Sequence, residues 1–247
     1  MASSYETYYG SKAYDERYPS ENRRTMRRVT TTVGPASLLI DVGAGNGRYA
    51  IPLALDGHHV VAVERSTAAL AQLERRVEEA GVARNVDIYA DLVDVPAVDL
   101  ARATHVLLLF GVLGHMTFRE RQSVLAVIGS SMPSVGRVIG SVPNRLRRFS
   151  HEQRSGRIVD GGAGRRFAYS RTLKGVTSTF EYTAFSPKEL RSELASHGWP
   201  VVRLAAESVG AEETVTNRRL VGWCDGILSS VLPPRLGYGI YFEAAKI

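Results

Sequence analysis

The residues best suited to bind a ligand lie between Asp41 and Gly47, in the stretch DVGAGNG. Gly43, Gly45 and Gly47 occupy three of five consecutive positions directly behind the apolar run LLIDV. Glycine loses more conformational entropy on folding than any other residue, so this cluster indicates backbone that turns tightly and approaches a ligand closely. A helix that begins behind the loop would add N–H groups that attract negative charge. The stretch therefore predicts a ligand-binding loop.

Acidic residues end the next two predicted strands. Glu64 ends VVAVE and Asp91 ends IYAD. In a doubly wound sheet these strand ends lie beside the ligand, where Glu64 could accept both hydroxyls of a ribose. Asp91 could accept a hydrogen bond from an adenine amino group. A dinucleotide-binding loop has the spacing G-x-G-x-x-G, but Arg48 occupies the position of its third glycine, which disfavours a dehydrogenase.

Alternating strands and helices must position these groups. Apolar runs predict strands and amphipathic runs predict helices in one continuous series, without a linker or repeat. Such alternation is typical of a parallel sheet with helices on both faces, in a single domain over residues 1–247. The expected strands cover about 37–43, 58–66, 85–92, 104–113, 137–144, 201–209 and 238–246. The expected helices cover about 20–33, 46–57, 66–81, 118–132, 186–198 and 212–228.

These motifs resemble those of the class I S-adenosylmethionine-dependent methyltransferases. The resemblance covers most of the chain: DVGAGNG, Glu64, the later ADL and the apolar HVLLLFGVLGHM each match a family motif. It implies an α/β, doubly wound, Rossmann-like fold with seven mostly parallel strands, the last one antiparallel. It also implies S-adenosyl-L-methionine as the cofactor and no metal. The cofactor-binding residues expected on this basis are Tyr14, Asp41, Gly43, Gly45, Gly47, Glu64, Arg65, Asp91, Leu92, Phe110 and Gly111.

Two further segments are expected near the acceptor. The tyrosine-rich arm, about residues 1–33, resembles a lid, in which Tyr9, Tyr14 and Arg17 would meet the substrate or the methionine carboxylate; packing against the sheet edge is the alternative. Residues 145–174 contain nine basic and two acidic side chains and are expected as an insertion over the active site. Arginine binds carboxylate and phosphate well, so Arg148 and His151 are candidate contacts to an anionic acceptor. A solvated loop is the alternative.

A general base is needed only when the acceptor must lose a proton before methyl transfer. His115 follows the fourth strand and is the candidate base, with a purely structural histidine as the alternative. The function expected is methylation of oxygen or nitrogen in a small, anionic metabolite or natural-product intermediate. Two alternatives stay open: methylation of the wobble uridine of tRNA, and S-adenosylmethionine binding without turnover.

Composition limits the setting of this chemistry. Cys224 is the single cysteine, which excludes an internal disulfide and agrees with a reducing compartment. No apolar run is long enough to span a membrane, and the N-terminus has no apolar signal segment. A cytoplasmic monomer or homodimer is therefore expected.

Overall fold

The main sheet carries the predicted topology. A computed structural model describes residues 4–10, 13–173 and 176–246. Its seven-stranded sheet has the order β3-β2-β1-β4-β5-β10-β9. The strands are β1 Leu38–Val42, β2 His59–Val63, β3 Val86–Tyr89, β4 His105–Leu108, β5 Arg137–Pro143, β9 Val201–Ser208 and β10 Gly239–Ala245. β10 alone in this sheet runs antiparallel, against both β5 and β9. The predicted fold class is confirmed.

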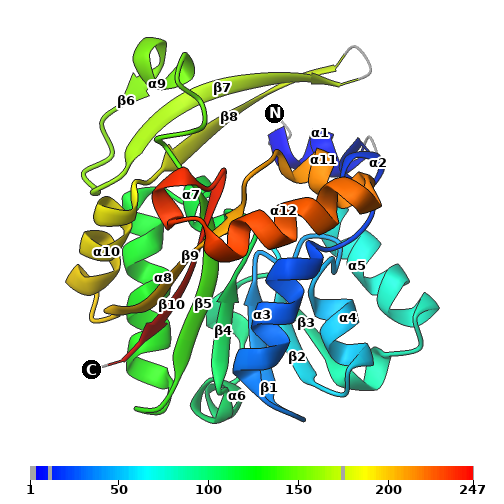
Figure 1. The fold of residues 1–247 in the computed structure, drawn as a ribbon. Helices are drawn as coiled ribbons and strands as arrows, with labels where there is room; N and C mark the ends of the chain where they lie inside the picture. Colours follow the sequence, from blue (N-terminus) through cyan, green and yellow to red (C-terminus); the bar gives the residue numbers. More distant parts are fainter. Residues whose placement is uncertain (1–3, 11–12, 174–175, 247) are drawn as a thin grey trace.

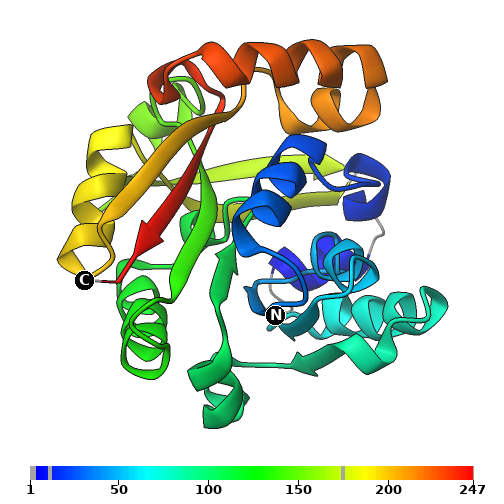
Figure 2. The same cartoon turned by 60° about the horizontal axis from the view of Figure 1, so that its bottom comes forward.

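Helices cover both faces of this sheet because its inner strands are apolar on both sides (Figures 1 and 2). Helices α3 Arg23–Val33, α4 Ala50–Leu55 and α5 Thr67–Glu79 pack on one face. Helices α6 Ala97–Arg102, α8 Phe118–Ser131 and α10 Pro187–Ser196 pack on the other. Trp199, which is almost fully buried, joins the second core, and its indole N–H donates to the carbonyl of Leu125.

Helix boundaries follow their capping side chains. Helix α3 begins at Arg23 rather than near Ser20, because the Asn22 side chain accepts the N–H groups of Arg24 and Thr25. Helix α10 begins where the sequence predicts it. Ser186 and Glu189 form a reciprocal capping box there.

The basic segment forms a second sheet rather than a loop. Strands β6 Arg157–Ile158, β7 Arg165–Leu173 and β8 Val176–Ala184 are antiparallel, and the short helix α9 Glu152–Ser155 precedes them. We call β6, β7 and β8 the cap. The cap extends to Ala184, beyond the predicted end of the insertion at Lys174, which itself lies outside the described residues. Its side chains alternate between two faces, a pattern that the many arginines obscure in the sequence.

The N-terminal arm is helical and docked. Helices α1 Ser4–Gly10 and α2 Ala13–Arg17 lie at the same end of the molecule as the cap and α11 Glu212–Asn217 (Figure 1). The Glu6 carboxylate accepts the N–H groups of Thr67 and Ala68 at 2.9 and 3.0 Å, so it caps the start of α5. The remaining helices are α7 Val112–His115 and α12 Arg219–Val231. Residues 1–3 and 11–12 of the expected lid lie outside the described residues.

Candidate functional site

A cavity of about 420 Å³ lies where the carboxyl ends of the parallel strands, the N-terminal arm and the cap meet. Such a position is where doubly wound sheets bind ligands. The cavity brings together most of the residues predicted from the sequence. On its wall lie Tyr9, Tyr14, Asp41, Gly43, Glu64, Arg65, Asp91, Leu92, Phe110, Gly111, His115 and Arg148.

Four predicted residues are not on this wall. Gly45 donates its N–H to Glu64 Oε2 at 2.8 Å and lies under the Tyr9 hydroxyl. Gly47 packs between α4 and α5, where a Cβ would meet the ends of two apolar side chains. Arg17 pairs with Glu213 at 2.5 Å, and His151 is exposed beside the start of α9. The two glycines therefore shape the loop, while Arg17 and His151 have partners or solvent elsewhere.

The glycine loop presents bare backbone to the cavity. Gly43 has φ 73°, and a Cβ at this position would collide with the side chain of Val112. The N–H groups of Gly43 and Ala44 donate to the carbonyl of Val63 at 2.8 and 3.0 Å. The loop is thus fixed against β2 in a left-handed conformation that favours glycine.

Two carboxylates lie beneath this loop. Asp41 is 3% exposed, and burial together with the charge of Glu64 raises its pKa to about 7. Burial also raises the pKa of Glu64, although backbone N–H groups partly oppose that effect. Glu64 Oε2 accepts from Gly45 and Oε1 from Ser66, both at 2.8 Å. This end of the cavity favours hydroxyl donors and positive charge.

At the same end of the cavity, charged side chains lie next to an apolar one. Arg65 pairs with Asp91 at 3.0 Å and with Glu120 at 3.2 Å. Leu92, directly after Asp91, is buried and lines the cavity. An apolar surface beside a carboxylate suits a purine ring with an exocyclic amino group.

A strained turn separates the two ends of the cavity. Phe110 and Gly111 have φ values of 55° and 79°, and a non-glycine residue in this region is uncommon. Ser141 holds the turn: its hydroxyl accepts the N–H of Phe110 at 2.9 Å and its carbonyl accepts that of Gly111 at 3.0 Å. The turn projects Phe110 into the cavity.

The other end of the cavity is aromatic and basic. Arg148 and Arg171 line it, and neither forms an ion pair with a carboxylate among the described residues. His115 contacts the ring of Tyr182, with the ring centroids 4.3 Å apart. Desolvation, followed by the charges of Arg166, Arg171 and Arg148, lowers the pKa of His115 to about 3. The imidazole is therefore neutral at physiological pH.

The cavity wall also contains residues that the sequence does not single out, among them Arg48, Glu207 and Arg171. Arg48 is 5% exposed, pairs with Glu212 at 2.9 Å and stacks on Phe110 at 4.3 Å. Glu207 is 7% exposed, and its pKa is raised to about 7 by burial and by Glu212. In the sequence, Arg171 is one of nine basic residues of the segment 145–174 and carries no signal of its own. The position of Glu207 at the end of a strand, like Glu64 and Asp91, was the available signal.

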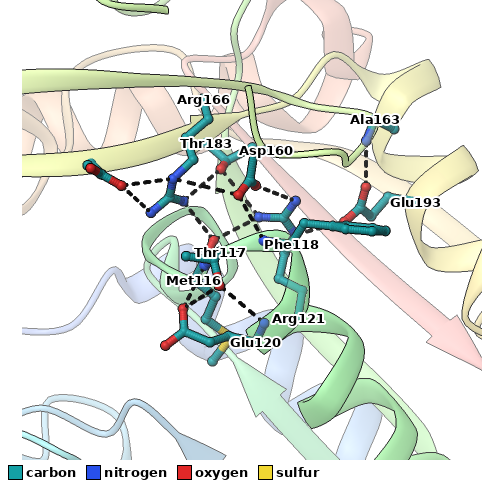
Figure 3. A network of polar contacts seen from close by, with 11 residues as sticks. Met116, Thr117, Phe118, Glu120, Arg121, Asp160, Ala163, Arg166, Thr183 and Glu193 are labelled. Atoms are coloured by element: carbon teal, nitrogen blue, oxygen red, sulfur yellow. Dashed lines mark hydrogen bonds and ion pairs between the residues drawn. The ribbon is translucent and has the colours of Figure 1, made fainter. Parts of the chain in front are cut away.

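A buried ion-pair network fastens the cap to the main domain (Figure 3). Arg121 of α8, which is fully buried, pairs with Glu193 at 2.7 Å and with Asp160 at 3.2 Å. Arg166 of the cap pairs with Glu181 at 3.2 Å. Both arginines donate to the carbonyl of Met116, at 2.7 and 2.8 Å, which fixes the backbone next to His115.

Two other kinds of feature concern the membrane and metal ions. No helix in the described part of the chain is both long and apolar enough to cross a bilayer. Among the described residues, no three His, Cys, Asp or Glu side chains converge as metal ligands would.

Comparison with known proteins places this geometry in a wider context. Residues 39–133 match a family model described as a methyltransferase domain. No curated protein sequence matches the chain. The glycopeptide N-methyltransferase MtfA, complexed with sinefungin, is structurally similar, with a TM-score of 0.62 and 18% identity over 92% of this chain and 87% of that one.

Two further structures are similar. The Burkholderia thailandensis 1,6-didemethyltoxoflavin-N1-methyltransferase has a TM-score of 0.59 and 19% identity, over 98% of this chain and 86% of that one. The CcbJ methyltransferase from Streptomyces caelestis has a TM-score of 0.63 and 15% identity, over 92% and 90%. At these identities the similarity demonstrates a shared fold.

Proposed function

We propose that this chain, an S-adenosylmethionine-dependent methyltransferase of class I, methylates a nitrogen or an oxygen of a small anionic metabolite or natural-product intermediate. The observation that carries the proposal is the opposite charge of the two cavity ends. Asp41 and Glu64 lie at one end, and Arg148 and Arg171 lie at the other. The toxoflavin enzyme and the glycopeptide enzyme, which share the fold, are named for small natural products as substrates.

The glycine-loop end has the features that this cofactor needs. Gly43 leaves its backbone without a side chain that would collide with Val112, and the Glu64 carboxylate, which accepts the N–H groups of Gly45 and Ser66, has acceptor capacity left for ribose hydroxyls. Arg48 lines the cavity, and its buried Nη1 finds no hydrogen-bond partner among the described residues, so it suits the methionine carboxylate. Asp91 and Leu92 would hold the adenine, while Phe110 and Gly111 would flank the methionine part. When bound, the cofactor supplies an activated methyl group on its sulfonium.

The cap end would orient the acceptor. Arg148 and Arg171 would bind its anionic group, and Tyr9 and Tyr14 would close the cavity from the N-terminal arm. The arm and the cap together exclude water from the reacting groups, which is the main contribution of the protein to such a transfer. A cavity of this size favours a small acceptor over tRNA.

Two side chains would manage the proton of the acceptor. His115, with a pKa of about 3, holds a proton weakly and would orient the acceptor by accepting a hydrogen bond. Glu207, with a pKa of about 7, is the stronger base, and the Thr25 hydroxyl holds its Oε1 at 3.1 Å. Glu207→Gln should lower kcat about 100-fold and remove the acidic limb of the pH–rate profile. His115→Gln should raise KM for the acceptor while leaving cofactor affinity unchanged.

Labelled transfer tests the proposal. The protein is incubated with methyl-labelled S-adenosylmethionine and either the low-molecular-weight fraction of a bacterial extract or total tRNA. Label should enter small acidic compounds that bind an anion-exchange resin. Label in tRNA, with a steep dependence on salt, would favour the RNA alternative. Calorimetric binding of S-adenosylhomocysteine without transfer to either fraction would favour a binding protein without turnover.

A further inference from the structure

The cap end of the cavity has one wall made of aromatic rings. Tyr169 and Phe180 are stacked, with centroids 5.4 Å apart and an interplanar angle of 26°. Phe149 lies 5.2 Å from Tyr169, and Tyr182 lies 5.8 Å from it. We call Phe149, Tyr169, Phe180 and Tyr182 the cap wall. All four line the cavity, so an occupant of this end would meet their rings.

A second aromatic wall faces it from the N-terminal arm. Tyr8, Tyr14, Tyr18 and Phe110, here called the arm wall, also line the cavity. Tyr18 lies 4.8 Å from Phe110, and Tyr14 lies 5.5 Å from Tyr18. The two walls meet where Tyr8 and Phe180 approach to 5.9 Å. Burial raises the pKa of Tyr8 to about 12, so its phenol stays protonated and uncharged at physiological pH.

Two arginines lie over aromatic rings at this end of the cavity. The Arg148 guanidinium stacks between Phe149 at 4.7 Å and Tyr238 at 4.4 Å. The Arg171 guanidinium lies 5.8 Å from the Tyr169 ring centroid. A guanidinium stacked on a ring keeps its N–H groups in its own plane, where they can meet a planar anion.

The charge of these arginines is not neutralised by the protein. Arg121 of α8 and Arg166 of β7, by contrast, each have carboxylate partners. Arg148 and Arg171 have none among the described residues, and the Arg148 Nε is buried without a hydrogen-bond partner in that part of the chain. Both side chains are partly buried, and a partly buried cation without a counter-ion favours a ligand that supplies one.

We propose that the acceptor is a planar aromatic acid, whose ring lies against the cap wall and whose anionic group binds Arg148 and Arg171. This inference rests on the proposed function and narrows its substrate class. An aliphatic anion would use the arginines and leave the aromatic walls without a function. An uncharged aromatic compound would leave two partly buried cations without a counter-ion. An aromatic acid satisfies both surfaces at once.

Calorimetry with matched probes tests the inference on protein saturated with S-adenosylhomocysteine. The probes are 2-naphthoate, its saturated counterpart decahydro-2-naphthoate and the uncharged 2-naphthylmethanol. We expect 2-naphthoate to bind at least about 10-fold more tightly than either of the other two. Arg171→Gln should weaken 2-naphthoate binding about 10-fold, and Tyr169→Leu should remove the preference for the aromatic over the saturated acid.

The matched control is Arg154→Gln, an exposed arginine of α9 outside the cavity, which should bind 2-naphthoate like the unchanged protein. Equal affinities for 2-naphthoate and its saturated counterpart, or equal effects of Arg171→Gln and Arg154→Gln, would overturn the inference. Failure to bind S-adenosylhomocysteine in the first step would instead contradict the proposed function. The two failures are thus distinguishable.

Discussion

The two ends of the cavity are built in opposite ways. The glycine-loop end consists of short contiguous stretches that follow β1, β2 and β3, and much of its contact surface is backbone. The cap end consists of side chains from α1, α2, β7, β8 and the segment before α9, which are distant in the sequence. A cofactor shared by many enzymes can be bound by backbone geometry, whereas an acceptor that differs between enzymes needs side chains that can change.

The two ends are also stabilised differently. Hydrogen bonds of the sheet and the adjoining backbone hold the glycine loop, whereas the Arg121–Asp160 ion pair and the hydrogen bond from Arg166 to the Met116 carbonyl hold the cap. Buried charges are costly when one partner is removed, while loop glycines are sensitive to any added side chain. Separate substitutions should therefore disable one end and spare the other.

The largest effect is expected from Arg121→Leu. The substitution leaves Glu193 buried without its cation and Asp160 with only the more distant Arg166 at 3.9 Å, so the free energy of unfolding should fall by about 3–5 kcal/mol. Urea unfolding followed by circular dichroism measures the loss. Arg119→Leu, an exposed neighbour on α8, is the control and should change it by less than about 0.5 kcal/mol. A loss below about 1 kcal/mol for Arg121→Leu would show that the ion pairs do not hold the cap.

Gly43→Ala should disable the other end. The new Cβ would collide with Val112 in a left-handed backbone conformation, so the loop must shift away from its present position. Affinity for S-adenosylhomocysteine should fall about 100-fold, or roughly 2.7 kcal/mol, by calorimetry. Gly57→Ala is the matched control, because Gly57 also has positive φ but no atom near its Cβ position. Comparable losses of affinity in both variants would contradict a specific role for Gly43.

The pH dependence of cofactor binding should sharpen the comparison further. The pKa of Asp41 is about 7 in the cofactor-free protein, and the positive charge of the ligand ammonium favours the ionised carboxylate. S-adenosylhomocysteine should therefore bind more tightly as pH rises through 7, by up to about tenfold per pH unit below it. Asp41→Asn should flatten this profile; an unchanged slope would place the titration elsewhere.

The raised pKa of Asp41 has the opposite effect on the stability of the cofactor-free protein, which falls as the pH rises. Because the folded pKa of Asp41 lies above the unfolded value, the stability it provides is complete in acid and is lost as pH rises through 7. Asp41→Asn should therefore raise the free energy of unfolding at pH 8 by about 1–2 kcal/mol, although it weakens cofactor binding. Chemical unfolding at pH 5 and pH 8 measures this increase in the free energy of unfolding. The increase should be smaller at pH 5 than at pH 8 and should not change sign.

The smallest effect is expected from His151→Ala. His151 lies in the basic segment but is exposed and does not line the cavity, so 2-naphthoate affinity should change by less than about twofold. A larger loss would restore the sequence-based prediction that His151 contacts the acceptor, and would extend the cap end beyond the residues described above.

The sequence alone predicted the seven-stranded fold, which is confirmed, and a methyltransferase domain, which a family model matches over residues 39–133. It could do so because Gly43, Glu64 and Asp91 each follow a strand that is recognisable from a few consecutive residues. The roles of individual site residues stay predictions, and His115 illustrates why: its type suggested a base, but the charges that lower its pKa come from β7 and the segment before α9.

Only the tertiary structure decided how the arginines of the basic segment are divided. Arg166 is buried and forms ion pairs with Asp160 and Glu181. Arg148 and Arg171, in contrast, line the cavity and pair with no carboxylate among the described residues. A sequence count treats these side chains as equal, since charge is a property of the residue. Partnership and burial are properties of long-range contacts, which the chain acquires only when the cap pairs its strands and packs on α7 and α1.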